Sequence, residues 1–142
     1  MSQTIYLTGI ADDGSYPSPE TPAYTAQLVT VPRGGDVTIY TDVFYPSGMP
    51  VVLANDTSAT AVFTVRSQPD PFLQPAIQYT LGPGIATASG FKNRIVLSIV
   101  PSDTAQYLPN RYWFDFWLTY RSLRYQIIQT SVFIISPTMS LP

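Results

Sequence analysis

The sequence contains no cysteine and no histidine among its 142 residues. Their absence excludes disulfides, Ser-His-Asp triads, Cys-His dyads and metal sites built from nitrogen and sulfur ligands. The chain also lacks a phosphate-binding P-loop and a dinucleotide-binding glycine pattern. We therefore expect no metal, no cofactor and no catalytic residues, and we interpret the protein as non-enzymatic.

Charge is scarce as well. Charged residues make up 11% of the chain, less than half of the share in an average soluble domain. Aromatic residues make up 13% and hydrophobic residues 45%, a composition typical of folded chains. The surface must therefore be covered by uncharged groups, and 13 Ser, 16 Thr and ten Tyr can supply them. Because Tyr is enriched in protein interfaces, we expect neighbouring subunits to cover part of this surface.

The formal net charge of −2 and the scattered cations exclude the basic patch that nucleic acids or anionic lipids require. The longest apolar runs are Ile95–Val100 and Ser131–Ile135. They are strand-sized, far below the length of about 20 residues that spans a bilayer. The first residues also lack the basic and apolar regions of a signal peptide. We expect a protein made in the cytoplasm and used without secretion, with no nucleic-acid or membrane partner.

Fourteen prolines separate short runs of β-branched and aromatic residues. Several runs alternate with period two, so that Val37, Ile39, Thr41 and Val43 share one face. Strands are predicted at residues 25–32, 37–44, 60–66, 77–81, 93–100, 111–120 and 124–135. This spacing predicts an all-β fold, a single antiparallel β-sandwich of Ig-like or Greek-key type over residues 25–142.

Residues 1–24 are expected to form an extended, Pro-rich arm outside this core, because the segment Tyr16–Pro22 holds three prolines. The alternative is a frayed tail. We expect the arm to make assembly contacts through its apolar and tyrosine side chains: Ile5, Tyr6, Leu7, Tyr16 and Tyr24.

Several short motifs follow one another in a recurrent order. They are Arg33-Gly34-Gly35-Asp36, Ser47-Gly48-Met49-Pro50, Ala61–Arg66, Gly90-Phe91, Pro101–Leu108 and Tyr112–Phe116. In this order they resemble the small β-sandwich domain of tailed-phage virion proteins, similar to the N-terminal domain of the lactococcal-phage upper baseplate protein. The resemblance covers about residues 28–136.

The resemblance implies a structural component of the virion whose partners are other virion proteins and copies of itself. Because the resembling domains act as adaptors, it implies a place in the tail, the baseplate or the fibre-attachment region. The alternative position is on the capsid, as a decoration or cement protein, since a small sandwich with an arm also suits the clamping of capsomers.

The strand Tyr112–Leu118 carries the residues best suited to ligand binding. Alternation places Trp113, Asp115 and Trp117 on one face. A carboxylate between two indoles can bind a sugar, so a glycan-binding module for host recognition is the alternative function. The interpretation that we favour is a structural ion pair between Asp115 and an arginine of a neighbouring strand, Arg66 or Arg94, because a buried carboxylate needs such a partner.

Overall fold

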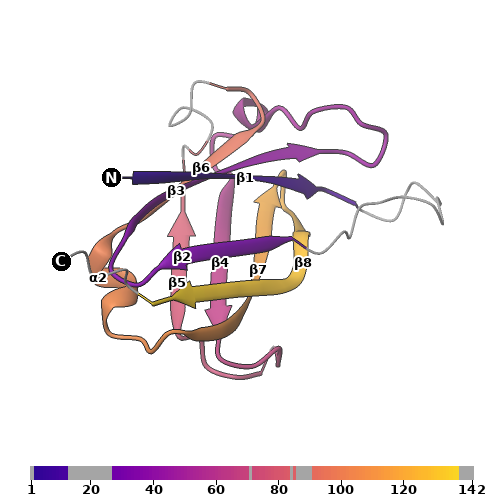
Figure 1. Ribbon diagram of the computed structural model, residues 1–142. Helices are drawn as coiled ribbons and strands as arrows, with labels where there is room; N and C mark the ends of the chain where they lie inside the picture. The colour runs from indigo at the N-terminus through magenta and orange to yellow at the C-terminus, as the bar shows by residue number, and fades with distance from the viewer. Residues whose placement is uncertain (1, 13–26, 71, 84, 86–90, 138–142) are drawn as a thin grey trace.

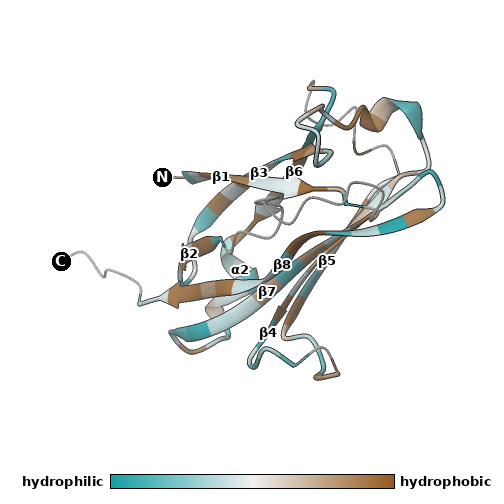
Figure 2. Ribbon diagram, turned by 90° about the vertical axis from the view of Figure 1, so that its right-hand side faces the viewer, coloured by the Kyte–Doolittle hydropathy of each residue, from teal (hydrophilic) through white to brown (hydrophobic). Residues whose placement is uncertain are grey.

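Two facing β-sheets make up the structure, a computed structural model that describes residues 2–12, 27–70, 72–83, 85 and 91–137. Figures 1 and 2 show the smaller sheet lying across the larger one. The smaller sheet has the order β1 (Ser2–Ile10), β3 (Asp36–Phe44) and β6 (Arg94–Ile99). The larger sheet has the order β2 (Leu28–Pro32), β8 (Leu123–Ser136), β7 (Asn110–Tyr120), β4 (Thr60–Arg66) and β5 (Ile77–Leu81). The predicted all-β, two-sheet fold is confirmed.

The core lies between the sheets and consists of the inner residue of each alternating pair. In β3 every second residue from Val37 to Val43 is buried, as the period-two pattern predicts. At the centre of the larger sheet the Phe63 ring stacks on Phe114 with ring centroids 5.0 Å apart and meets Phe116 edge-on at 5.2 Å. Such aromatic pairs add about 0.5–1.5 kcal/mol each to the burial of their surface.

Strands β7 and β8 form a hairpin whose two turn residues, Arg121 and Ser122, have φ values of 52° and 64°. Positive φ at both positions matches the twist of the flanking strands. The β7–β8 pairing shifts its register around Phe116, and β8 curves along its length (Figure 1). A bulge of this kind bends a strand. Strand β2 pairs with the end of β8. Because β8 bends, β2 runs crosswise to β4 and β5 (Figure 1).

Two short helices complete the described chain, the 3₁₀ helix η2 (Leu53–Asn55) and the α-helix α2 (Pro101–Ala105). The Asp103 carboxylate accepts hydrogen bonds from the Val100 N–H at 3.0 Å and from the Tyr79 hydroxyl at 2.7 Å. Burial and the bond to Asp103 raise the pKa of Tyr79, so its hydroxyl stays protonated and remains a donor. These bonds fasten α2 to strand β5.

Two strand pairs differ from the predicted antiparallel arrangement, because β1–β3 and β2–β8 are parallel. The consecutive strands β2 and β3 lie in different sheets. The turn between them therefore carries the chain from one sheet to the other. A strand that returns to the same sheet after such a crossing can pair in parallel, which a tight hairpin does not allow.

The segment Ser2–Ile10 also differs from its prediction as part of an arm outside the core. It is strand β1, and it pairs with β3 from Ser2 opposite Asp36 to Ile10 opposite Phe44. Leu7 and Ala11 belong to the core, with exposed fractions of 5% and 1%. The reason is the apolar face that alternation gives this strand, which is more stable when it covers the sandwich than when it is extended in solvent. Tyr16, Tyr24 and the prolines near them lie outside the described residues.

One buried hydroxyl lacks a hydrogen-bond partner among the described residues, that of Thr41 in the inner face of β3. The substitution Thr41→Val keeps the shape of the side chain and removes this polar group. We expect the free energy of unfolding to rise by about 1–2 kcal/mol, measured by urea denaturation. Thr64 is the control, because it is also buried but its hydroxyl accepts a hydrogen bond from Gln78 at 3.2 Å. Thr64→Val should give no gain, and a less stable Thr41→Val protein would contradict the assignment.

Candidate functional site

Two groups of side chains on the outer faces of the sheets are candidates for function. The first lies on β7, whose inner residues Phe114 and Phe116 are buried in the core. The alternate residues Trp113 and Trp117 are half-buried on the outer face. Asp115 lies between them with 7% of its surface exposed. The sequence therefore placed this row on the correct strand and face.

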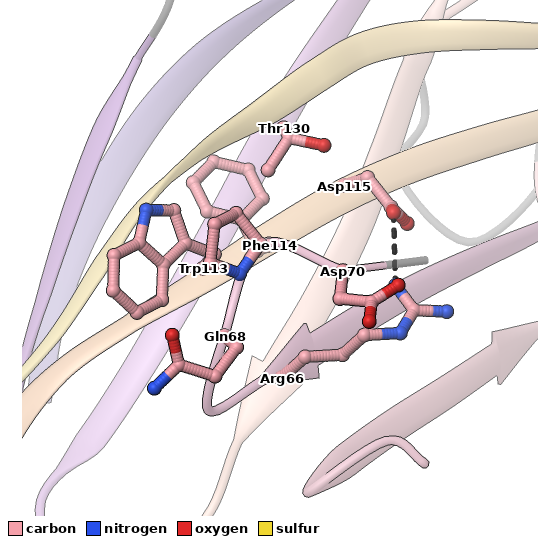
Figure 3. Close-up of a pocket in the computed structure, with 8 residues that line it drawn as sticks. Arg66, Gln68, Asp70, Trp113, Phe114, Asp115 and Thr130 are labelled. Carbon is pink, nitrogen blue, oxygen red and sulfur yellow. Dashed lines mark hydrogen bonds and ion pairs between the residues drawn. The ribbon is translucent and has the colours of Figure 1, made fainter. Parts of the chain in front are cut away.

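Arg66 holds the Asp115 carboxylate. Its Nη1 lies 3.0 Å from Asp115 Oδ2, and its Nε donates to the Leu73 carbonyl at 3.1 Å. Figure 3 shows the Arg66 guanidinium reaching the Asp115 carboxylate, with the Trp113 ring on the other side of the view. Of the two arginines that the sequence offered as partners, the structure pairs Arg66 with Asp115. Arg94 lies on the other sheet and pairs with Asp42.

The space around this ion pair is small. A hollow of about 10 Å³ is lined by Arg66, Asp70, Trp113 and Asp115 among others (Figure 3). That volume is close to the minimum needed for one water molecule, far too small for a sugar ring. On the far side of the row, the guanidinium of Arg124 lies over the Trp117 ring, 4.4 Å from its centroid. Arg66 therefore already binds the carboxylate, and Arg124 covers one of the two indoles.

The second group lies on the outer face of the smaller sheet, around Arg94. Its guanidinium makes a two-pronged pair with Asp42, with Nε 2.8 Å from Oδ1 and Nη2 3.2 Å from Oδ2. The same guanidinium carbon lies 4.1 Å from the ring centroid of Phe91, 4.9 Å from that of Tyr40 and 5.7 Å from that of Tyr6. We call these five residues the aromatic cluster.

The aromatic cluster faces outward although it is rich in apolar surface. Tyr6 is 66% exposed and Phe91 is 54% exposed, and the rings of Tyr6 and Tyr40 lie 5.5 Å apart. The hydrogen bond from Arg94 to Asp42 raises the pKa of the arginine, so the guanidinium stays charged. An open hollow of about 440 Å³ adjoins Phe91 and Arg94 and is also lined by Phe44 and Pro50. Arginine and large aromatic side chains are the residues that dominate binding energy in protein interfaces.

The sequence predicted only two members of this cluster, and in other roles. Tyr6 was predicted as an arm contact and Arg94 as a partner of Asp115. Alternation along β3 could have placed Tyr40 and Asp42 on the outer face. What joins them to Tyr6 is the parallel pairing of β1 with β3, in which Tyr6 lies opposite Tyr40. No local pattern in the sequence specifies that pairing.

The other predicted arm residues have separate positions. Ile5 is partly buried and packs against the core, and Leu7 belongs to the core itself. Within the described residues no group of three acidic or other ligating side chains could hold a metal ion. None of the helices in this part of the chain is long and apolar enough to cross a membrane.

Comparison with known proteins finds likeness among solved structures. The sequence matches no protein family, and no curated protein is similar to it. Among solved structures, the chain is similar to the N-terminal domain of ORF48 of phage TP901-1. The identity is 12% and the TM-score 0.47, over 96% of this chain and 98% of that domain. A TM-score below 0.5 at this identity is too low to establish a shared function.

The Asp115 carboxyl gives a prediction of pH dependence. Burial raises its pKa above the ordinary 3.8, and the nearby Arg66 guanidinium only partly opposes this rise. Above pH 3.8 the folded state therefore binds more protons at this site than the unfolded state. The contribution of the Asp115 carboxyl to the free energy of unfolding therefore falls as the pH rises through the raised pKa. Asp115→Asn cannot ionise and serves as the reference.

We expect the difference in unfolding free energy, wild type minus Asp115→Asn, to fall as the pH is raised from below this pKa and then to level off. Urea denaturation of both proteins across the acidic range measures it. A difference that grows with pH would mean that the Arg66 pair outweighs burial.

Proposed function

We propose that this chain is a non-enzymatic structural protein of a tailed-bacteriophage virion, an adaptor in the tail, baseplate or fibre-attachment region. It assembles with other virion proteins and with copies of itself. The order of its sequence motifs supports this proposal, and so does the charge-poor composition of its surface. The observation that carries the assembly role is the exposed aromatic cluster around Arg94.

The aromatic cluster suits burial by a partner because its charges are already paired. A buried arginine without a partner costs several kcal/mol, whereas Arg94 has both prongs of its guanidinium on Asp42. The rings of Tyr6 and Phe91 present apolar area that gains free energy when it is covered, about 25 cal/mol for each Å². A partner surface can therefore close over the cluster without leaving a charge unsatisfied.

Its contiguity distinguishes the cluster from several other exposed apolar side chains. Met49, Phe72, Leu108 and Leu123 are also more than half exposed, with fractions of 63%, 95%, 72% and 53%. Single exposed apolar residues are ordinary on protein surfaces, whereas contiguous apolar patches mark sites of interaction. The rings of Tyr6, Tyr40 and Phe91 form such a patch because all of them surround one guanidinium.

Quantitative mass spectrometry of purified particles tests the proposal. We expect the chain to be present in virions of the phage that encodes it, at a few to dozens of copies as suits a tail adaptor. Hundreds of copies would instead place it on the capsid as a decoration protein. Its absence from intact particles would overturn the virion role altogether.

A matched pair of phenylalanine substitutions tests the aromatic cluster. Phe91→Ala removes a central ring of the cluster, so incorporation into particles should fall by about tenfold or more, the scale of a binding hot spot. Phe72→Ala removes the same ring from a site where it is 95% exposed, and incorporation should be unchanged. Each variant is expressed in trans during infection and counted in purified particles, with circular dichroism as the check on folding. Equal incorporation of both variants would exclude the cluster from the interface.

A further inference from the structure

Within the residues that the structure describes, strand β1 has one edge without a neighbouring strand. It is the outermost strand of the smaller sheet and pairs with β3 along its other side. Backbone N–H and C=O groups of successive strand residues point to opposite sides. The Thr8 N–H donates to Gln27 Oε1 at 2.8 Å, and the Thr8 carbonyl accepts from Gln27 Nε2 at 2.6 Å. The Thr8 backbone therefore points away from β3, and the backbones of Thr4 and Tyr6 point to the same side.

The Gln27 side chain closes this edge at Thr8. Its amide supplies one acceptor and one donor to the Thr8 backbone, as the peptide groups of an added strand would. No hydrogen bond within the described part of the chain satisfies the outward backbone groups of Thr4 and Tyr6. With respect to the described residues, the open part of the edge therefore runs from Ser2 to Tyr6.

The edge also lacks the features that keep edge strands from pairing. Charged side chains, proline and short length are the usual protections. Strand β1 is nine residues long, SQTIYLTGI, without charge or proline. The other edge strands are shorter: β2 and β5 have five residues each and β6 has six. In addition β2 ends in Pro32 and β6 begins with Arg94.

We infer that the open edge of β1 pairs antiparallel with the same segment of a second copy of the chain, with Thr4 opposite Thr4 of that copy. The inference deepens the proposed assembly role and rests on it for its biological meaning. In this register Tyr6 lies opposite Ser2 of the second copy, so all outward backbone groups from Ser2 to Tyr6 find partners. The pairing ends before Thr8, and the Gln27 amide is left in place.

The segment is suited to a copy of itself for two reasons. It carries no charge, so symmetric pairing brings no like charges together, and Thr opposite Thr is a favourable cross-strand pair. Side chains directly opposite each other in a sheet share one face. The two smaller sheets therefore join into one continuous sheet, and both aromatic clusters lie on the same side of it. The dimer presents a doubled surface for another virion protein.

Substitution of Thr4 tests the pairing in the full chain. Thr4→Pro removes the outward N–H and leaves the β1–β3 hydrogen bonds intact, since proline is tolerated where the N–H faces away from the sheet. Thr4→Val keeps that N–H and serves as the matched control. Sedimentation velocity over a concentration series should show a dimer for the wild type and for Thr4→Val. Dimerisation of Thr4→Pro should be weaker by about tenfold or more, because symmetry removes two hydrogen bonds.

Amide hydrogen exchange of the wild type gives a second readout that holds even if Thr4→Pro does not fold. The Thr4 and Tyr6 amides should gain protection as the protein concentration rises, whereas the Thr8 amide should be protected at all concentrations. A monomer at every soluble concentration overturns the inference, and so does a Thr4→Pro protein that dimerises as well as Thr4→Val. A monomeric chain found in virions would leave the virion role standing and overturn only self-pairing. A dimer that is absent from virions would leave self-pairing standing and overturn only the virion role.

Discussion

Burial of aromatic and aliphatic side chains between the two sheets is the interaction on which the rest of this structure depends. The sequence has no cysteine, so no disulfide reinforces the fold. In the larger sheet the buried Phe63 ring contacts Phe114, Phe116 and Phe133. Strand β1 joins this core through Leu7, which is why the first residues of the chain belong to the sandwich.

Because charge is so scarce, the position of each ion pair matters. Arg66 joins β4 to β7 through Asp115, and Arg94 joins β6 to β3 through Asp42. Both pairs lie on outer faces and bridge strands that are already hydrogen-bonded to each other. They fix side chains of the outer faces. What remains exposed beside them is aromatic and hydroxyl surface, whose chemistry is that of an interface.

Much of the fold could be predicted from sequence, because it depends on local alternation. The strands Thr60–Arg66 and Ile77–Leu81 have the predicted bounds, and Thr41 lies on the predicted inner face. What could not be predicted depends on which strands are neighbours. Alternation shows that a segment is a strand but not which strand it pairs with or in which direction. The prolines after Tyr16 therefore suggested an arm, and the choice between Arg66 and Arg94 stayed open. The aromatic cluster was missed for the same reason, since it exists only because β1 lies beside β3.

The edge of β1 and the aromatic cluster share one residue, Tyr6. Tyr6 contributes its ring to the cluster, while its backbone belongs to the open edge. A protein that acted alone would be expected to protect a long edge with charge or proline, and to cover exposed rings with polar side chains. Among the described residues the protection comes from the Gln27 amide, which satisfies Thr8 and leaves the residues before it open. An edge protected at one end specifies where pairing stops, and a defined stop fixes the register of the added strand. Low charge, which would be a liability for an isolated domain, therefore agrees with the proposal that a second copy covers the edge and another virion protein covers the rings.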